Sequence, residues 1–190
     1  MSKAVLISMR PMWCELIASG QKTVEVRKTK PSAILPLKCY IYCTKPSFPH
    51  EDFLVFDAGT KKVKAFYGGG KVIGEFVCER IIDWSYIPDP DERAEPGSMA
   101  YDILTKDGER TCLEYDVIEA YGKGAPLYGW CISDFAIYDK PRELSEFRRW
   151  CPNNLYCESC AMFSMNAETC GNLALVLNRP PLSWMYVEEI

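Results

Sequence analysis

The sequence has a single histidine, no long hydrophobic run and no strong net charge. Its one histidine, His50, falls in a segment predicted to be irregular, so we expect no general acid or base built on histidine. No apolar run approaches the roughly 20 residues that span a bilayer, and the first ten residues lack a signal-peptide layout. A net charge of −4 is also unlike that of proteins that bind nucleic acid nonspecifically, which need many cations. These absences predict a soluble protein without a membrane partner.

Repeats, low-complexity segments and a phosphate-binding P-loop are absent as well. The Gly-rich stretch at 68–71 (GGGK) lacks both the upstream glycine and the following Ser or Thr of a P-loop. What remains is ordinary globular composition, with 48% hydrophobic and 25% charged residues. A chain of 190 residues fits one domain with an appendage.

Ten cysteines are present without an export signal, which argues against an oxidised secreted scaffold. Six of them stand singly in apolar segments, where a thiol packs as a small hydrophobe. We therefore expect a reducing, cytoplasmic location. The six single cysteines are Cys14, Cys39, Cys43, Cys78, Cys112 and Cys131.

The charges are unevenly distributed along the chain. Residues 1–45 carry eight basic and two acidic side chains, whereas residues 83–119 carry eleven acidic and three basic ones. Such a division can steer an anion towards one face of a protein. The alternative is that both runs are solvated surface.

Hydrophobic periodicity predicts an α+β fold rather than an alternating doubly wound sheet. We expect a small mixed barrel or curled sheet with two or three helices. A helix should begin at Pro11 and end at Gly20, and the strand after it should place Val24 and Val26 on one face. The other predicted elements are strands at 4–8, 23–29, 37–44, 72–77 and 128–137 (ended by 139–141), helices near 113–121 and at 144–150, an irregular stretch at 46–70 and an acidic loop near 88–97.

The segment from Gly20 to Arg27 (GQKTVEVR) carries the most chemical information. Lys22 follows the predicted helix end, and Glu25 and Arg27 share one face of the next strand. An arginine fork suits a phosphate or a base edge, and a glutamate can accept from a base amino group. The alternative is a polar outer strand face with one weak salt bridge.

Gly20, Lys22, Glu25 and Arg27 reproduce the G-x-K-x-x-E-x-R signature, and the chain resembles ASCH domains, relatives of the PUA fold. The opening LISMRP and the later GKVIGEF and YGWCISDFAIYDKP segments resemble that family too, so that the match spans roughly residues 4–145. The resemblance implies a PUA-like mixed β-barrel whose cleft binds RNA or a modified nucleoside. The residues it implies for binding are Lys22, Thr23, Glu25 and Arg27.

The same resemblance implies an alternative, a hydrolase that uses Lys22 and Glu25. Some ASCH-like proteins resemble amidohydrolases acting on acylated cytidine through a lysine, a threonine and a glutamate. Lys22 matches their lysine, but Glu25 stands where their threonine falls, and none of the acidic residues between Glu75 and Glu119 aligns with their glutamate. A ribonuclease would need a general base and a cation near the phosphate, roles open to Glu25, Lys22 and Arg27. Binding is the interpretation we favour.

Exposed aromatic rings are the other ingredient of single-strand RNA recognition. Candidates for stacking are Tyr128, Trp130, Trp184 and Tyr186. The alternative is that they are core, and we expect Trp130 in particular to pack and Trp184 to attach the C-terminal segment to the rest of the chain.

Four further cysteines, Cys151, Cys157, Cys160 and Cys170, lie in the last forty residues. Cys157 and Cys160 have the spacing of a metal knuckle, and two flanking thiolates would complete a tetrahedral zinc site. An iron–sulfur cluster and reduced thiols without a metal are the alternatives. We thus expect an ASCH domain over residues 1–142 and a Cys-rich extension over 143–190 that packs on it. A protein-interaction module that acts through a metal-bound extension is a second functional alternative.

Overall fold

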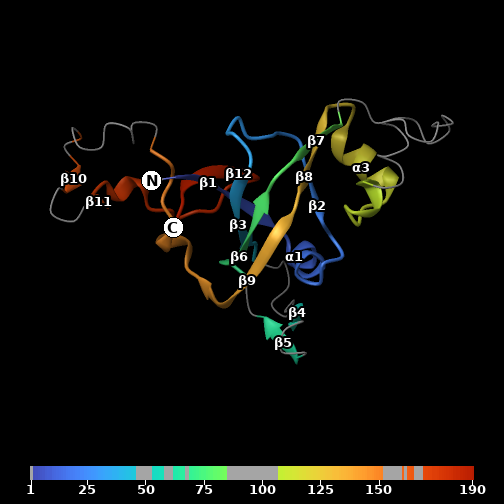
Figure 1. Ribbon diagram of the computed structural model, residues 1–190, viewed down its shortest axis with the longest axis horizontal. Coiled ribbons are helices and arrows are strands. Elements are labelled where there is room, and N and C mark those ends of the chain that lie inside the picture. The colour runs from blue at the N-terminus through green and yellow to red at the C-terminus, as the bar shows by residue number, and fades with distance from the viewer. Residues whose placement is uncertain are drawn as a thin grey trace.

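The centre of the protein is a five-stranded sheet with the order β12-β1-β3-β6-β9 (Figure 1). The computed structural model describes residues 2–45, 53–57, 62–66, 69–84, 107–151, 160, 162–164 and 169–190. Strands β1 and β3 are parallel, and the other neighbours in this sheet are antiparallel. The bounds are β1 Lys3–Met9, β3 Leu37–Cys43, β6 Lys71–Cys78, β9 Ser133–Arg142 and β12 Trp184–Glu188.

A three-stranded sheet, β2-β8-β7, lies beside the first, with β2 at Val24–Arg27, β8 at Leu127–Cys131 and β7 at Ile81–Trp84. Two strand pairs are smaller: β4 (Phe53–Asp57) with β5 (Lys62–Phe66), and β10 (Phe163–Ser164) with β11 (Thr169–Cys170). The helices whose bounds are described are α1 (Pro11–Ala18) and α3 (Tyr115–Gly122), and the described 3-10 turns are η2 at Leu144–Glu146 and η4 at Leu173–Leu175.

The mixed α+β class is therefore confirmed, but the predicted barrel is not. The strands in the described part of the chain form separate sheets of five, three, two and two strands and do not close on themselves. Consecutive strands β8 and β9 belong to different sheets, and the predicted single strand 128–137 is in fact these two strands. Between them the Ile132 N–H donates to the Thr23 carbonyl oxygen at 2.9 Å, at the point where the chain leaves one sheet for the other.

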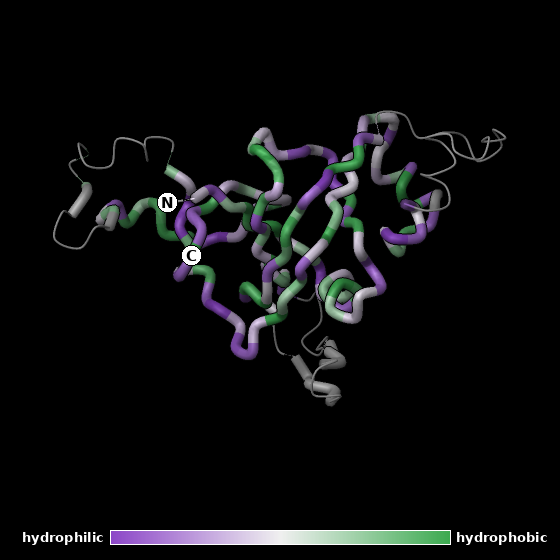
Figure 2. Tube along the Cα trace, in the orientation of Figure 1, coloured by the Kyte–Doolittle hydropathy of each residue, from purple (hydrophilic) through white to green (hydrophobic). Residues whose placement is uncertain are grey.

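Strand β1 is buried on both faces, which explains its continuous apolar run. Val5, Ile7 and Met9 pack with Cys14 and Ile17 of α1 in one core cluster. Alternate residues of β1 and β3 face a second cluster, completed from the C-terminal region by Phe147, Leu177 and Val187. Figure 2 shows the hydrophobic segments gathered along these central strands. A third cluster, around Trp84, fills the space between the small sheet and α3.

Three local predictions were wrong. The stretch 46–70 is not wholly irregular, because β4 and β5 pair antiparallel within it; the run Phe53–Phe56 has the aromatic and β-branched character typical of strands. Strand β9 does not end at 139–141 but continues to Arg142. The helix expected at 144–150 is reduced to η2, because a seven-residue helix is marginal alone and Phe147 instead enters the core.

The C-terminal residues reach back to the first strand of the chain. Strand β12 pairs antiparallel with β1, from Lys3 opposite Glu188 to Ile7 opposite Trp184. The Arg148 guanidinium donates to the carbonyl oxygens of Cys170 and Asn172, each at 2.9 Å. The acidic loop predicted near 88–97 lies outside the described residues. Within the described ranges, no helix has the length and apolar character to cross a membrane.

Candidate functional site

The G-x-K-x-x-E-x-R segment connects the end of α1 to the small sheet. Gly20 has φ of +76°, a left-handed conformation that ends the helix as the sequence predicts. The Lys22 N–H then donates to the Leu16 carbonyl oxygen at 2.9 Å, which folds the chain back under α1. Strand β2 follows, with Val24 and Val26 in the third core cluster. The alternation along the strand therefore directs Glu25 and Arg27 to the opposite face.

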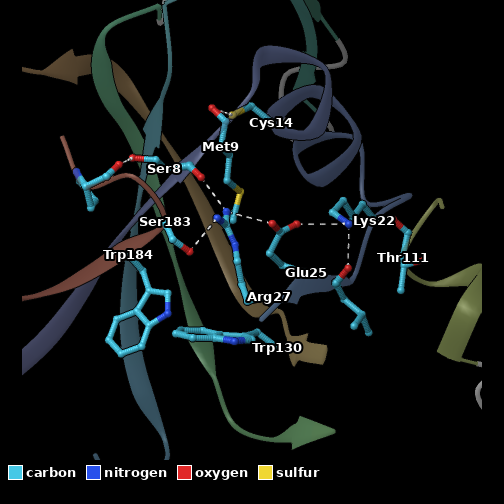
Figure 3. A network of polar contacts seen from close by, with 12 residues as sticks. Ser8, Met9, Cys14, Lys22, Glu25, Arg27, Thr111, Trp130, Ser183 and Trp184 are labelled. Carbon is cyan, nitrogen blue, oxygen red and sulfur yellow. Dashed lines mark hydrogen bonds and ion pairs between the residues drawn. The ribbon is translucent and has the colours of Figure 1, made fainter. Parts of the chain in front are cut away.

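Lys22, Glu25 and Arg27 form a buried triad of charges (Figure 3). Their exposed fractions are 2%, 6% and 8%, so the alternative of a solvated outer strand face is wrong. One Glu25 oxygen lies 3.2 Å from Lys22 Nζ, and the other lies 2.9 Å from Arg27 Nη2. With two cations and one anion, the triad carries a formal excess of one positive charge.

The Lys22 ammonium uses all three of its N–H groups within the protein. Besides Glu25, it donates to the carbonyl oxygen of Val24 at 2.9 Å and to that of Thr111 at 2.7 Å. The Trp13 ring lies over it, with its centroid 5.1 Å from Nζ. Lys22 thus fastens β2 to the segment that precedes α3, and it has no donor left for a ligand.

The Arg27 guanidinium is less completely engaged. Its Nη2 also donates to the Ser8 carbonyl oxygen at 2.6 Å, and its Nη1 donates to Ser183 Oγ at 3.3 Å. Its Nε is buried and has no hydrogen-bond partner. Buried polar atoms nearly always have a hydrogen-bond partner, so a buried guanidinium Nε without one is unusual.

The triad forms the floor of a pocket of about 460 Å³. This volume lies within the range of roughly 300–1,000 Å³ that is usual for small-molecule sites. Apart from the exposed Arg10, the rim of the pocket is apolar: Leu182 is fully exposed, Val117 is 49% exposed and Tyr121 is 38% exposed. The other lining residues are Ser8, Met9, Arg10, Trp13, Val26, Thr44 and Leu113.

The sequence-predicted site residues divide into two groups. Lys22, Glu25 and Arg27 come together at the pocket floor, whereas Thr23 is absent from the pocket lining. The Thr23 hydroxyl oxygen instead accepts a hydrogen bond from Arg110 Nε at 3.1 Å. Thr23 and Glu25, both implied for binding, therefore do not share the same surroundings.

None of the four aromatic residues proposed for stacking lines the pocket. Trp130 is fully buried, which confirms the expectation that it packs. Its ring meets the Trp184 ring edge to face at a centroid distance of 5.5 Å. Trp184 Nε1 donates to Thr29 Oγ1 at 2.9 Å, so Trp184 attaches the C-terminal segment as predicted.

Sequence reasoning missed the walls of the pocket. Trp13 had a weak signal, as an aromatic residue on the helix that ends beside the motif. The lining residue Leu182 had none, and neither had Ser183, a hydrogen-bond partner of Arg27, since both lie more than 150 positions beyond Arg27. Ser183 is held in place because the Ser8 N–H donates to its carbonyl oxygen at 2.9 Å and the Ser8 hydroxyl donates to the Pro181 carbonyl oxygen at 2.7 Å.

Thiols close to the triad are unsuited to nucleophilic chemistry. Burial raises the pKa of Cys14 well above its ordinary value, and the neighbouring Cys43 and Glu25 raise it further. A hydrogen bond from Cys14 lowers the pKa of Cys43, but Cys43 is fully buried and does not line the pocket. A thiol must be both ionised and accessible to attack a substrate, and neither cysteine meets both conditions.

The metal prediction for the C-terminal cysteines falls partly outside the described residues, because Cys157 is among those not described. Cys151 and Cys170 are half-buried, and Cys160 is exposed. Across the part of the chain that the structure describes, no group of three or more His, Cys, Asp or Glu side chains is placed to hold a metal ion. The four-cysteine site stays a prediction.

No family model and no curated protein matches the sequence. Solved structures do match: the ASCH protein of Zymomonas mobilis is 18% identical over 98% of this chain and 88% of its own, with a TM-score of 0.55. A single-substitution variant of that protein has the same identity and TM-score, over 99% of this chain and 92% of its own. The chain therefore has the ASCH-domain fold, as its G-x-K-x-x-E-x-R segment predicts.

Proposed function

We propose that this protein binds RNA or a modified nucleoside, and that one nucleoside unit occupies the pocket above the buried triad. The observation that carries the proposal is the unpartnered Arg27 Nε on a pocket-lining guanidinium. Because Nε is shielded from solvent, a ligand oxygen or ring nitrogen would supply the missing acceptor after a small shift of the Arg27 side chain. Hydrogen bonds to a charged donor are worth about 1.5–3 kcal/mol each, enough to orient a ligand.

Glu25 adds an acceptor next to this donor. Each of its carboxylate oxygens takes one ion-pair partner, which leaves further lone pairs on both. A donor and an acceptor side by side match the polar edge of a nucleobase, which presents both kinds of group. The apolar rim formed by Leu182, Val117 and Tyr121 suits the faces of the ring.

Lys22 has a positioning role in this proposal. Its three donors are committed to Glu25 and to two backbone carbonyl oxygens. It holds the Glu25 carboxylate in place and balances its charge, while Arg27 and Glu25 contact the ligand. This assignment departs from the sequence-based expectation that Lys22 itself contacts a phosphate or base.

Binding is better supported than the hydrolase alternative. Among the described residues that line the pocket, Glu25 is the one carboxylate, and both of its oxygens are tied to cations. Hydrolysis by general acid–base catalysis usually needs a second carboxylate or a histidine, which the described lining does not supply. The Ser8 hydroxyl lines the pocket but donates to the Pro181 carbonyl oxygen. The alternative of a protein-interaction module rests on the predicted metal site of the extension, part of which lies outside the described residues, and it gains no support from the pocket.

The test is fluorescence anisotropy of a labelled single-stranded RNA at low and at physiological salt, with competition by free and acylated nucleosides. Val117→Glu places a charge on the exposed rim and should weaken binding about tenfold or more without disturbing the buried triad. Ile34→Glu is the matched control, because Ile34 is 91% exposed and does not line the pocket. Absence of any binding, or equal binding by both variants, would contradict the proposal.

A further inference from the structure

We infer that the ligand enters the pocket base first, so that its phosphate stays outside, next to Arg10. This inference rests on the proposed function, since it assigns the orientation of a nucleotide in the same pocket. The pocket could in principle accept either end of a nucleotide. Three features of the floor and the rim favour the base.

The first feature is the supply of donors at the floor. A phosphate has three or four strongly accepting oxygens, which proteins usually meet with several cations or backbone N–H groups. Here the Lys22 ammonium is fully committed, and three of the donors of Arg27 already bind Ser8, Ser183 and Glu25. Two N–H groups of Arg27 remain, the buried Nε and one on Nη1, and they suit the edge of a base better than the three or four oxygens of a phosphate.

The second feature is charge. Glu25 lies at the floor, and its carboxylate would repel a buried phosphate dianion. The buried triad has a formal excess of one positive charge, less than the phosphate would bring. A base edge is uncharged and can use the Glu25 carboxylate as an acceptor for an N–H group.

The third feature is the position of the accessible cations. Arg10 lines the pocket and is exposed, and the exposed Lys45 follows the lining residue Thr44. The exposed Lys28 places its ammonium 4.9 Å from the centroid of the Tyr121 ring on the rim. A phosphate at the mouth would meet hydrated cations there and keep most of its own hydration.

The experiment is isothermal titration calorimetry of the full chain with adenosine, cytidine, guanosine and uridine, with their 5′-monophosphates, and with orthophosphate. We expect at least one nucleoside to bind and its monophosphate to bind about two- to fivefold more tightly, the range of an exposed charge pair. Arg10→Gln should remove that difference. Arg149→Gln is the matched control, since Arg149 is exposed and does not line the pocket.

Several outcomes would overturn the base-first orientation. These are displacement of a bound nucleotide by orthophosphate, binding of monophosphates but not nucleosides, and an unchanged monophosphate preference in Arg10→Gln. If only polymeric RNA binds, an abasic chain of equal length replaces the nucleosides: loss of binding supports the inference, and equal binding overturns it. Failure of the proposed function would be distinct, because then nucleosides, monophosphates and RNA would all fail to bind.

Discussion

Two triads of charged side chains in this protein differ in their surroundings. The side chains of the buried triad, Lys22, Glu25 and Arg27, are at most 10% exposed. An outer triad consists of Lys38 between Glu75 and Glu189, at 3.2 and 3.5 Å, and these three side chains are between 27% and 36% exposed. The distances within the two triads are similar. Distance alone therefore does not distinguish a site from a surface ion pair, whereas burial does.

Burial of the Lys22–Glu25–Arg27 triad has an unfavourable desolvation free energy. Charges removed from water lose their hydration, and this loss is offset only if every remaining donor and acceptor finds a partner. Lys22 meets that condition, and Arg27 meets it except at Nε and at one N–H of Nη1. The outer triad needs no such completeness, because solvent can replace any missing contact. We therefore expect substitutions to have large effects in the first triad and small ones in the second.

The largest effect should come from Glu25→Gln. This change leaves Lys22 and Arg27 buried without a counter-ion, so the free energy of unfolding should fall by about 3–5 kcal/mol. Urea denaturation followed by tryptophan fluorescence measures the loss. A loss below about 1 kcal/mol would show that solvent reaches the buried triad and would contradict the expected difference between the two triads.

Lys22→Met should have the next largest effect and lower the free energy of unfolding by about 3 kcal/mol. Glu25 would still have Arg27 as its counter-ion, but the carbonyl oxygens of Val24 and Thr111 would lose their donor. Lys38→Met is the matched control in the outer triad, with an expected change below about 1 kcal/mol. Equal losses for the two variants in urea denaturation would contradict a positioning role for Lys22.

The thiol of Cys78 is a buried ionisable group without a counter-ion. Burial raises the pKa of the Cys78 thiol to about 12, since its neighbours are the Cys131 thiol and backbone groups. In the unfolded chain the pKa of this thiol is lower, about 8.5. The contribution of Cys78 to the free energy of unfolding is therefore complete below that pH and is lost as the pH rises above it. Stability should then fall by about 1 kcal/mol per pH unit as the pH rises from 9 towards 12.

The measurement is the free energy of unfolding between pH 8 and pH 11 for the wild type and for Cys78→Ala. The variant is less stable throughout, and its profile should be flatter above pH 9. Parallel profiles would mean that Cys78 ionises in the folded protein as easily as in the unfolded chain.

Arg27→Lys keeps the charge of the buried triad and removes the guanidinium fork. We expect RNA or nucleoside affinity to fall about tenfold, equivalent to about 1.4 kcal/mol, because Nε is the donor proposed for the ligand. Competition anisotropy measures the affinity, and urea denaturation shows how far folding is affected. Unchanged affinity would show that the charge of Arg27 suffices and that its Nε has no ligand.

The smallest effect should come from Glu189→Gln in the outer triad. Lys38 keeps Glu75 as a partner, so the free energy of unfolding should change by less than about 1 kcal/mol. The change should shrink further in high salt, which screens exposed charges. A loss as large as that of Glu25→Gln would remove burial as the deciding factor.

Local pattern in the sequence predicted much of the frame. Apolar runs predicted the strands β1 and β3, Gly20 marked the end of α1, and the motif placed Glu25 and Arg27 on one strand face. These features depend on neighbouring residues and on the strand pleat, which a linear pattern records. The same pattern could not show whether that face meets solvent.

Tertiary structure decided the site itself. Burial of the triad depends on Ser8, Thr111 and Ser183, which contact Lys22 or Arg27 from distant parts of the chain. Leu182 reaches the pocket rim because β12 returns to pair with β1, and the split of 128–137 into β8 and β9 depends on which strands lie alongside. The sequence alone determined which charges are two and three residues apart, but only packing decided which of their donors remained for a ligand, because that count depends on contacts across the whole chain.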